Sequence, residues 1–489
     1  MADRPNIIFL LPDQLRPDFL SCYGADFIET PNIDSLAAEG VRYDRAYSGS
    51  PVCVPARTAL LTGMNAVRNG VTDNLHRLRP DYAEAGISTW PQLLAQCDYY
   101  TAAIGKMHFY PWDALHGFQL RVICEDKRWL NVRDDYFHYL RRMGLRKLHG
   151  NEHEGYFDNK GAIIHDLPWE HSWDRFVGRE ACRFIENYGD DGPFAMMVGF
   201  PGPHCPYDPA FDFPEVFAPE DMPDSIPDAG DTPRLRQNNV DGNKRPWNGV
   251  DYTEFTEDHK KKIRAHYAAL VKGIDHEVGL ILETLRSKGL LDNTIIIFAT
   301  DHADYLGDHN LIGKASFFET CMKIPLIVRV PGIGEGTVSS DLVELRDVTA
   351  TMLRFAGVDV PANMDSQTLP GLPVSDPASA KGPRKRIFGL LTDGWMIHDG
   401  RWKLARYNTG ESVLFDLGSD PLEQNNLITD PAHATELQRL DTELTTYLMD
   451  EFRISMHDRL AHSGDMSQDP GFGHEGWQQP FPAPISFVE

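Results

Sequence analysis

Cysteine is scarce in this sequence and irregularly spaced. The chain of 489 residues contains 7 Cys, an odd number, and none of them forms a Cys-x-x-Cys pair. Secreted proteins that depend on disulfides usually carry an even number of cysteines in a regular pattern. The spacing therefore argues against a disulfide framework and favours reduced thiols.

Long hydrophobic runs are also missing. No stretch reaches the roughly 20 apolar residues that a transmembrane helix needs. The first apolar run, residues 7–11, is followed directly by Pro12 and Asp13 and is too short for a secretory signal. We therefore expect a cytoplasmic protein that does not associate with membranes.

Positive charge is in short supply. Lys and Arg total 47 against 72 for Asp and Glu, which gives a formal net charge of −25. Such a chain repels phosphate backbones, so we expect no nucleic-acid partner. It also repels small anions at long range, and any anion site must therefore be built from a few local cations.

The length suits one large domain and a smaller one. We expect a catalytic domain over residues 1–380, an α+β subdomain over 381–461 and an extended tail over 462–489. The tail is rich in Gly, Pro and aromatic residues and has no periodicity. This composition is typical of a disordered segment or of one that lies across a neighbouring subunit, and it is our basis for expecting a homo-oligomer, either a dimer or a tetramer.

Short apolar runs alternate with helical patterns along the first part of the chain. Four of these runs predict buried strands: residues 6–11, 193–200, 294–299 and 324–330. Residues 30–40 and 259–288 have the pattern of helices. The alternation predicts an α/β fold with a large, mixed but mostly parallel sheet sandwiched by helices.

The last part of the chain has a different pattern. Residues 360–386 are rich in Pro, Ser and Asp and form a predicted connector. The Asp399-Gly400 turn after it separates two apolar stretches, which is the signature of a β-hairpin. With a further apolar run at 412–417 and a helix at 434–450, these residues predict a small C-terminal subdomain with an antiparallel sheet.

Polar residues follow three of the predicted strands. Asp13-Gln14 follows the first strand, His204 the second and Asp301-His302 the third. Parallel α/β sheets bind their ligands at the carboxyl ends of the strands. We therefore expect a site at this edge of the sheet.

One motif indicates the chemistry of that site. Cys53-Val54-Pro55-Ala56-Arg57, with Leu-Thr-Gly at residues 61–63, resembles the signature of the type I sulfatases within the alkaline phosphatase superfamily. The resemblance extends from Pro5 to about Asn426 and implies an alkaline phosphatase-like catalytic domain. It also implies that a separate maturing enzyme oxidises Cys53 to formylglycine while the chain is unfolded. Taken alone, a buried thiol beside a helix start is the alternative interpretation.

The resemblance gives the modified Cys53 a defined task. One hydroxyl of the hydrated aldehyde attacks the sulfur of the ester, and the second allows collapse to the aldehyde with release of sulfate. Arg57 lies one helical turn after Cys53 and is expected to bind the nucleophile and the carboxylates of the metal site. The same resemblance implies that Asn74 hydrogen-bonds the hydrated nucleophile.

A divalent metal is expected beside this nucleophile. The resemblance places it between Asp13 and Asp301, with Gln14, His302 and the modified Cys53 completing the ligands. Calcium is the usual metal of the family, and the imidazole leaves manganese open. Many arylsulfatases have Asp-Asp and Asp-Asn at the two pairs, whereas the Asp-Gln and Asp-His pattern found here is similar to that of phosphonate monoester hydrolases and choline sulfatases.

Further cations are expected to bind the substrate. Gly105-Lys106-Met107-His108 matches the Gly-Lys-x-His motif whose Lys and His hold sulfate oxygens in the family. If the segment is extended, Lys106 and His108 point the same way and stabilise the charge on those oxygens. His204, in a Pro-His-x-Pro motif, and Lys314 are expected to donate a proton or hydrogen bond to the leaving oxygen.

The leading hypothesis is a sulfatase that hydrolyses sulfate monoesters in the manner of an arylsulfatase, with phosphate and phosphonate esters open as side substrates. The alternatives are a choline sulfatase, a phosphonate monoester hydrolase or phosphodiesterase, and a non-catalytic binding protein on the same scaffold. Aromatic residues in and near the variable loops are either core, oligomer contact or a cage for a cationic leaving group: Trp129, Tyr136, Phe137, Trp169, Trp173 and Trp247.

Overall fold

A computed structural model describes residues 4–189, 192–213, 215–333, 336–374 and 382–456. Its centre is an eight-stranded sheet of order β5-β4-β6-β1-β7-β8-β2-β9. β8 runs antiparallel to both β7 and β2, and the other pairings are parallel. The predicted mixed, mostly parallel sheet is therefore confirmed.

Ten strands lie in the described part of the first 344 residues. They are β1 (Asn6–Asp13), β2 (Val41–Tyr43), β3 (Ala46–Tyr47), β4 (Tyr100–Gly105), β5 (Leu120–Ile123), β6 (Phe194–Pro203), β7 (Thr294–Ala299), β8 (Leu326–Arg329), β9 (Thr337–Ser339) and β10 (Val343–Glu344). β3 and β10 pair with each other outside the main sheet. The four runs predicted as strands correspond to β1, β6, β7 and β8.

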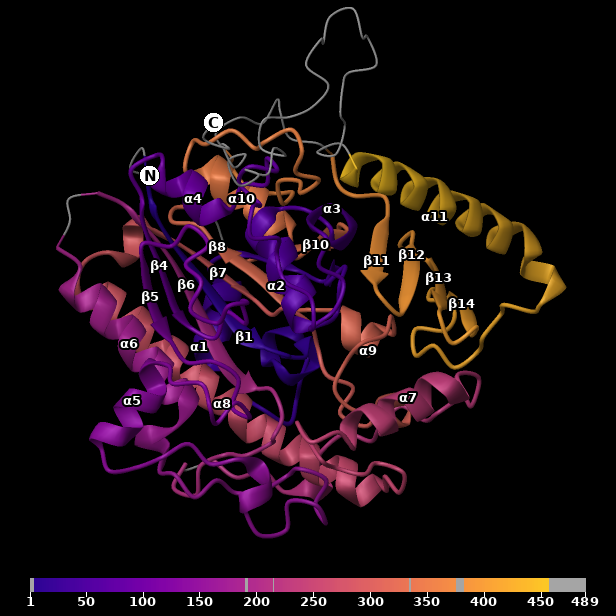
Figure 1. The fold of residues 1–489 in the computed structure, drawn as a ribbon, viewed down its shortest axis with the longest axis horizontal. Helices are drawn as coiled ribbons and strands as arrows, with labels where there is room; N and C mark the ends of the chain where they lie inside the picture. The colour runs from indigo at the N-terminus through magenta and orange to yellow at the C-terminus, as the bar shows by residue number, and fades with distance from the viewer. Residues whose placement is uncertain (1–3, 190–191, 214, 334–335, 375–381, 457–489) are drawn as a thin grey trace, which may run out of the picture.

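Helices cover both faces of the sheet (Figure 1). They are α1 (Pro31–Ala38), α2 (Cys53–Thr62), α3 (Ala66–Asn69), α4 (Trp90–Ala95), α5 (Asp135–Arg142), α6 (Trp173–Asn187), α7 (Pro233–Asn243), α8 (Glu257–Ser287), α9 (Glu319–Met322), α10 (Asp347–Phe355) and α11 (Ala434–Ser455). No helix in the described ranges is both long and apolar enough to cross a bilayer.

Alternate residues of the strands point to opposite faces, as the pleat requires. Ile8 and Leu10 of β1 join a hydrophobic core with α1, α5, α6 and α8. Ile7 and Phe9 join a second core with α2, α4 and α10. The strands are apolar on both faces because both faces are covered.

A second sheet lies toward the C-terminus, with α11 along it (Figure 1). Its antiparallel strands are β11 (Ile387–Leu391), β12 (Gly394–His398), β13 (Trp402–Tyr407) and β14 (Ser412–Asp416). The predicted hairpin is the β12–β13 pair, joined through Asp399 and Gly400. The domain boundary expected at residue 380 and the tail over 462–489 lie outside the described residues.

Four neighbouring strands, β4, β6, β1 and β7, end at the same edge of the sheet. Two glycines allow close approach there. Gly105 pairs with Gly199, and a Cβ added at Gly199 would lie 2.1 Å from the carbonyl oxygen of Lys106. The segment after β4 is thereby held tightly against β6, which fixes the position of Lys106.

The contact between α6 and α8 buries an acid. Both carboxylate oxygens of Glu277 lie near Nη1 of Arg175, the closer at 3.2 Å, and the Glu277 side chain is fully buried. Gly178 makes room for it, since a Cβ there would lie 2.0 Å from Oε2 of Glu277. Burial raises the pKa of Glu277 to about 8, although Arg175 opposes the shift.

This burial predicts a pH-dependent stability. The pKa of Glu277 is about 8 in the folded chain, against an ordinary value of 4.5. Between pH 4.5 and pH 8, the folded chain therefore binds this proton more readily than the unfolded chain does. The stability that this proton supplies is complete at acidic pH and is lost as pH rises toward 8, at up to about 1.4 kcal/mol per pH unit. Glu277→Gln should flatten the fall in free energy of unfolding between pH 5 and 8, measured by urea denaturation. Parallel curves for the two proteins would contradict the assignment.

Candidate active site

Cys53 is the first residue of α2, at the carboxyl edge of the sheet. The residue is fully buried, and α2 ends at Gly63, whose φ of 63° suits a helix C-terminus. Asn74 accepts a hydrogen bond from the backbone N–H of Val54 at 2.9 Å, so its side chain caps the start of the helix. The helix terminus that presents Cys53 is therefore held from a separate loop.

Asp13, Cys53, Asp301 and His302 form a compact cluster. One ligand atom from each lies within 4.8 Å of the others, and all four residues are buried. Sγ of Cys53 is 3.2 Å from Nε2 of His302 and 3.8 Å from Oδ1 of Asp13. Residues from β1, α2 and the loop after β7 thus converge on one point.

Arg57 ties this cluster together. Its Nε donates to Asp301 at 2.8 Å and its Nη2 to Asp13 at 3.1 Å. Its Nη1 donates to the carbonyl of Lys106 at 2.6 Å. The planar guanidinium carries its donors on three separate nitrogens, so it can reach three acceptors that lie apart. One side chain therefore fixes two carboxylates and the backbone after β4.

The donor set fits a divalent cation. Nδ1 of His302 lies 3.0 Å from the carbonyl of Ala303, which assigns the proton to Nδ1 and leaves Nε2 as an electron-pair donor toward the cluster. The carboxylates of Asp13 and Asp301 supply hard oxygen donors. The sulfur of Cys53 is a soft donor and matches such a set less well than an oxygen would.

Gln14 lies at the edge of the cluster with φ of 71°. Its side-chain oxygen accepts from Nζ of Lys314 at 2.7 Å, and its amide nitrogen donates to Asp304. Its backbone N–H donates to Asp301 at 3.1 Å. The residue contacts Asp301 through its main chain and Lys314 through its side chain.

Lys106 and His108 both reach the site, but not from an extended segment. β4 ends at Gly105, and positive φ angles at Gly105 and His108, 96° and 59°, turn the chain. Nζ of Lys106 lies 2.8 Å from Asp13, and the imidazole of His108 interacts electrostatically with Cys53. The expectation of an extended segment was wrong, because the turn brings both side chains to the same side.

Lys314 and His204 face Cys53 from the opposite side. Nζ of Lys314 is 2.8 Å from Sγ of Cys53 and 2.7 Å from Nε2 of His204. Nδ1 of His204 lies 2.7 Å from the carbonyl of Cys205. Burial lowers the pKa of His204 well below its ordinary value, and the positive charges of Lys314 and Arg128 lower it further. In this arrangement Lys314 is the donor and His204 the acceptor, which differs from the expectation that His204 itself donates, because its Nδ1 proton is directed to the Cys205 carbonyl.

Three residues of the site escaped the sequence analysis. Asp126 pairs with Lys106 at 3.2 Å and with Arg128 at 2.7 Å. Asp304 accepts from the backbone of Gly313 at 2.9 Å and so fixes the loop that carries Lys314. The charged run of residues 125–128 has the pattern of an exposed loop, and only the tertiary fold buries it.

Cations gather at the site. Four of them meet four carboxylates: Arg57, Lys106, Arg128 and Lys314 with Asp13, Asp126, Asp301 and Asp304. Burial alone would raise the pKa of Asp13, but the charges of Lys106, Arg57 and Lys314 hold it well below its ordinary value. A strongly acidic protein thus builds a local site suited to an anion.

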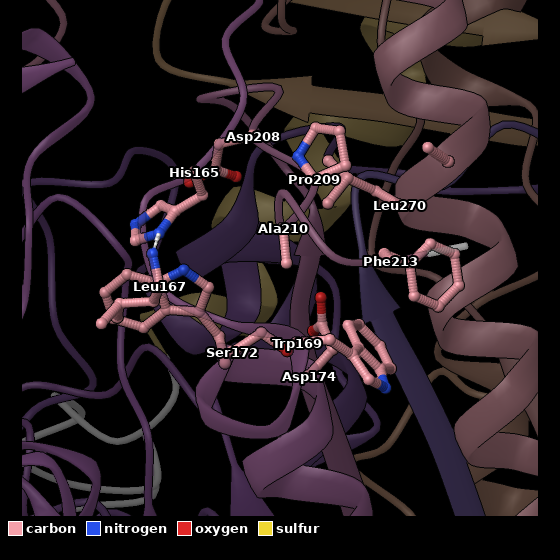
Figure 2. A pocket seen from close by; sticks show the side chains of 12 residues that line it. His165, Leu167, Trp169, Ser172, Asp174, Asp208, Pro209, Ala210, Phe213 and Leu270 are labelled. Carbon is pink, nitrogen blue, oxygen red and sulfur yellow. Dashed lines mark hydrogen bonds between the residues drawn. The ribbon is translucent and has the colours of Figure 1, made fainter. Parts of the chain in front are cut away.

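The aromatic residues noted in the sequence separate into groups. Tyr136 and Trp173 belong to the hydrophobic core. Trp169 lies beside Phe213 at the small hollow in Figure 2, whose volume of about 20 Å³ is enough for roughly one water. Trp129 packs edge-on against His108, with ring centroids 4.9 Å apart. Of these four residues, Trp129 is the one that contacts the site.

Comparison with known proteins gives the family. The sulfatase family profile matches residues 5–358, and the profile of the C-terminal region of N-sulphoglucosamine sulphohydrolase matches residues 307–450. The chain belongs to the sulfatase family. It is accordingly a sulfuric ester hydrolase by class.

Several sulfatases match over most of their length. A choline-sulfatase of Rhizobium meliloti is 30% identical over 454 residues, which cover 88% of this chain and 83% of the relative. An arylsulfatase of Clostridium perfringens is 28% identical and covers 89% and 93%. The crystal structure of phosphonate monoester hydrolase of Agrobacterium radiobacter shares the fold, with a TM-score of 0.76 at 23% identity over 92% of this chain and 96% of that one.

The three donors of Arg57 generate a prediction for the sulfatase site. Lysine has one nitrogen and cannot replace bonds to Asp13, Asp301 and the Lys106 carbonyl. Because it would leave a buried carboxylate unpaired, Arg57→Lys should lower the free energy of unfolding by about 3–5 kcal/mol. Chemical denaturation followed by fluorescence measures this loss.

Arg79→Lys is the matched control for this measurement. Arg79 pairs with Asp81 at 2.7 Å on the surface, with the two side chains 33% and 56% exposed. Its replacement should change the stability by less than about 1 kcal/mol. Similar losses for the two variants would refute the central role of Arg57.

Proposed function

We propose that this sulfatase hydrolyses sulfate monoesters with a formylglycine nucleophile made from Cys53. The observation that carries the proposal is the position of Cys53. It lies fully buried at a helix terminus, in contact with His302 and Lys314 and within 3.8 Å of Asp13. Replacing its sulfur by oxygen would complete a set of hard donors.

Asp13, Gln14, Asp301, His302 and the modified Cys53 would hold one divalent cation. Calcium is our first assignment because carboxylate and amide oxygens dominate the set, and the imidazole of His302 keeps manganese as an alternative. When bound, the cation favours the ionised form of a coordinated hydroxyl and neutralises negative charge.

Arg57 orients the two carboxylates and the nucleophile. Lys106 and His108 bind the sulfate oxygens, and they stabilise the negative charge on those oxygens during attack. Lys314 donates a proton or hydrogen bond to the leaving oxygen, while His204 holds the Lys314 ammonium by accepting from it at 2.7 Å. Asn74 caps α2 and thereby fixes the direction in which the nucleophile points.

A phosphonate monoester hydrolase or phosphodiesterase is the second candidate. Gln14 and His302 replace the acidic and amide residues of many arylsulfatases and leave more positive charge at the site. The fold likeness to phosphonate monoester hydrolase of Agrobacterium radiobacter is compatible with this candidate. Lys106 beside Asp13 favours sulfate as the main substrate, since it adds a cation on the side that would hold the substrate's oxygens.

Maturation of Cys53 can be tested directly. We expect the peptide containing Cys53 to carry an aldehyde in place of the thiol when the chain is co-expressed with a formylglycine-generating enzyme, as measured by mass spectrometry. The peptide containing the half-buried Cys97 is the internal control and should keep its thiol. Cys53→Ala should abolish sulfate release. Full activity with an unmodified thiol would overturn the mechanism.

The substrate preference generates a second test. A sulfate monoester has three non-bridging oxygens to be held by cations, whereas a phosphonate monoester has two. Lys106→Ala and His108→Ala should each lower kcat/KM for an aryl sulfate by about 100-fold or more and for an aryl phosphonate monoester by clearly less. Equal losses for the two substrates would favour the phosphonate hydrolase instead.

A further inference from the structure

A hollow of about 540 Å³ opens beside the candidate site. It shares Arg128 and Trp129 with the surroundings of the site, and its wall also includes Trp247, Asn131 and His149. Trp247 is 43% exposed, unusually high for so large an apolar side chain. The position and size suit the part of a substrate that remains after the sulfate group is bound.

Trp129 connects the hollow to the sulfate-binding side of the site. Its ring meets His108 edge-on with centroids 4.9 Å apart, and Tyr110 lies 6.0 Å from both rings. His108 in turn interacts electrostatically with Cys53. Trp129 therefore joins the wall of the hollow to His108 of the candidate site.

Arg128 connects the hollow to the leaving-group side. Its Nη2 lies 3.4 Å from Nε2 of His204, and its guanidinium carbon lies 4.7 Å from the ring centre of Trp247. Two hydrogen bonds to Asp126, at 2.8 and 2.7 Å, lock the guanidinium in this position. A fixed positive charge thus sits at the point where the leaving group would enter the hollow.

The described residues that line the hollow offer no free negative charge to balance a cationic ligand. Glu152 is the one carboxylate among them, and it is bound by Arg146 at 2.6 Å and by the backbone N–H of His149 at 2.8 Å. Asp126, behind Arg128, is shared between Arg128 and Lys106. A quaternary ammonium group binds best to an aromatic surface. On the surface of this hollow, the positive charge of Arg128 would repel it.

We propose that this hollow is the leaving-group subsite and accepts a ring that presents an apolar face and carries no positive charge. The inference rests on the proposed function, because it assumes a sulfate ester in the adjacent site. Trp129 and Trp247 provide the stacking surface, and Arg128 determines specificity by repelling cations. Choline sulfate is therefore a poor substrate, in contrast to the substrate named for the choline-sulfatase of Rhizobium meliloti.

The matured full-length enzyme tests this with three substrates: 4-nitrophenyl sulfate, N-acetylglucosamine 6-sulfate and choline sulfate. We expect kcat/KM for choline sulfate to be at least about 100-fold below the better of the two ring substrates. The aryl and sugar arms identify which kind of ring is preferred. A value for choline sulfate equal to or above both rings would overturn the inference while leaving the proposed function intact.

Two variants and a control separate specificity from folding. Trp247→Ala should lower kcat/KM for the preferred ring about ten-fold with little effect on choline sulfate. Arg128→Gln should raise the ratio of choline sulfate to ring activity. Trp395→Ala removes a similarly exposed tryptophan that does not line the hollow. This control should change neither kcat/KM for the preferred ring nor kcat/KM for choline sulfate.

Equal losses on all substrates in both variants would assign Trp247 and Arg128 a purely structural role and overturn the inference. No sulfate release from any substrate, by an enzyme in which Cys53 is shown to be modified, would overturn the proposed function and the inference with it.

Discussion

The site depends on one buried guanidinium. Asp13 ends β1 and Asp301 follows β7, and two carboxylates brought this close inside a protein repel each other strongly. Arg57 binds both and also holds the carbonyl after β4. The helix that carries Arg57 also carries Cys53. The same helix therefore fixes the position of Cys53 and the positions of the two carboxylates.

Much of this arrangement could be predicted from the sequence. β1, β6 and β7 are apolar runs that end in polar residues, and the rule that parallel strands end at one edge brings Asp13, His204 and Asp301 together. Motifs that resemble those of the sulfatases added Lys106 and Lys314. Asp126 and Arg128 could not be predicted, since a run of charged residues gives no sign that the fold will bury it. The turn at His108 was missed because its positive φ is set by packing rather than by residue type.

Charge is distributed very unevenly in this sulfatase. The net charge of −25 belongs to the chain as a whole, while the candidate site brings four cations together with four carboxylates. Repulsion by the surface slows the approach of anions, and the site then binds them at short range, where burial strengthens each interaction. The fixed position of Arg128 extends this positive field toward the adjacent hollow and links the binding of the anionic group to the choice of leaving group.

The burial of Cys53 has a consequence for the life of the protein in the cell. Its side chain is fully enclosed once α2 has packed against the sheet, so no other macromolecule can touch the sulfur of the finished fold. Any enzyme that oxidises this residue must act during or soon after synthesis, in competition with folding. If Cys53 is the precursor of the proposed formylglycine, a chain that folds first keeps its thiol and is inactive. Under this proposal, the yield of working enzyme is decided by relative rates rather than by the stability of the final structure.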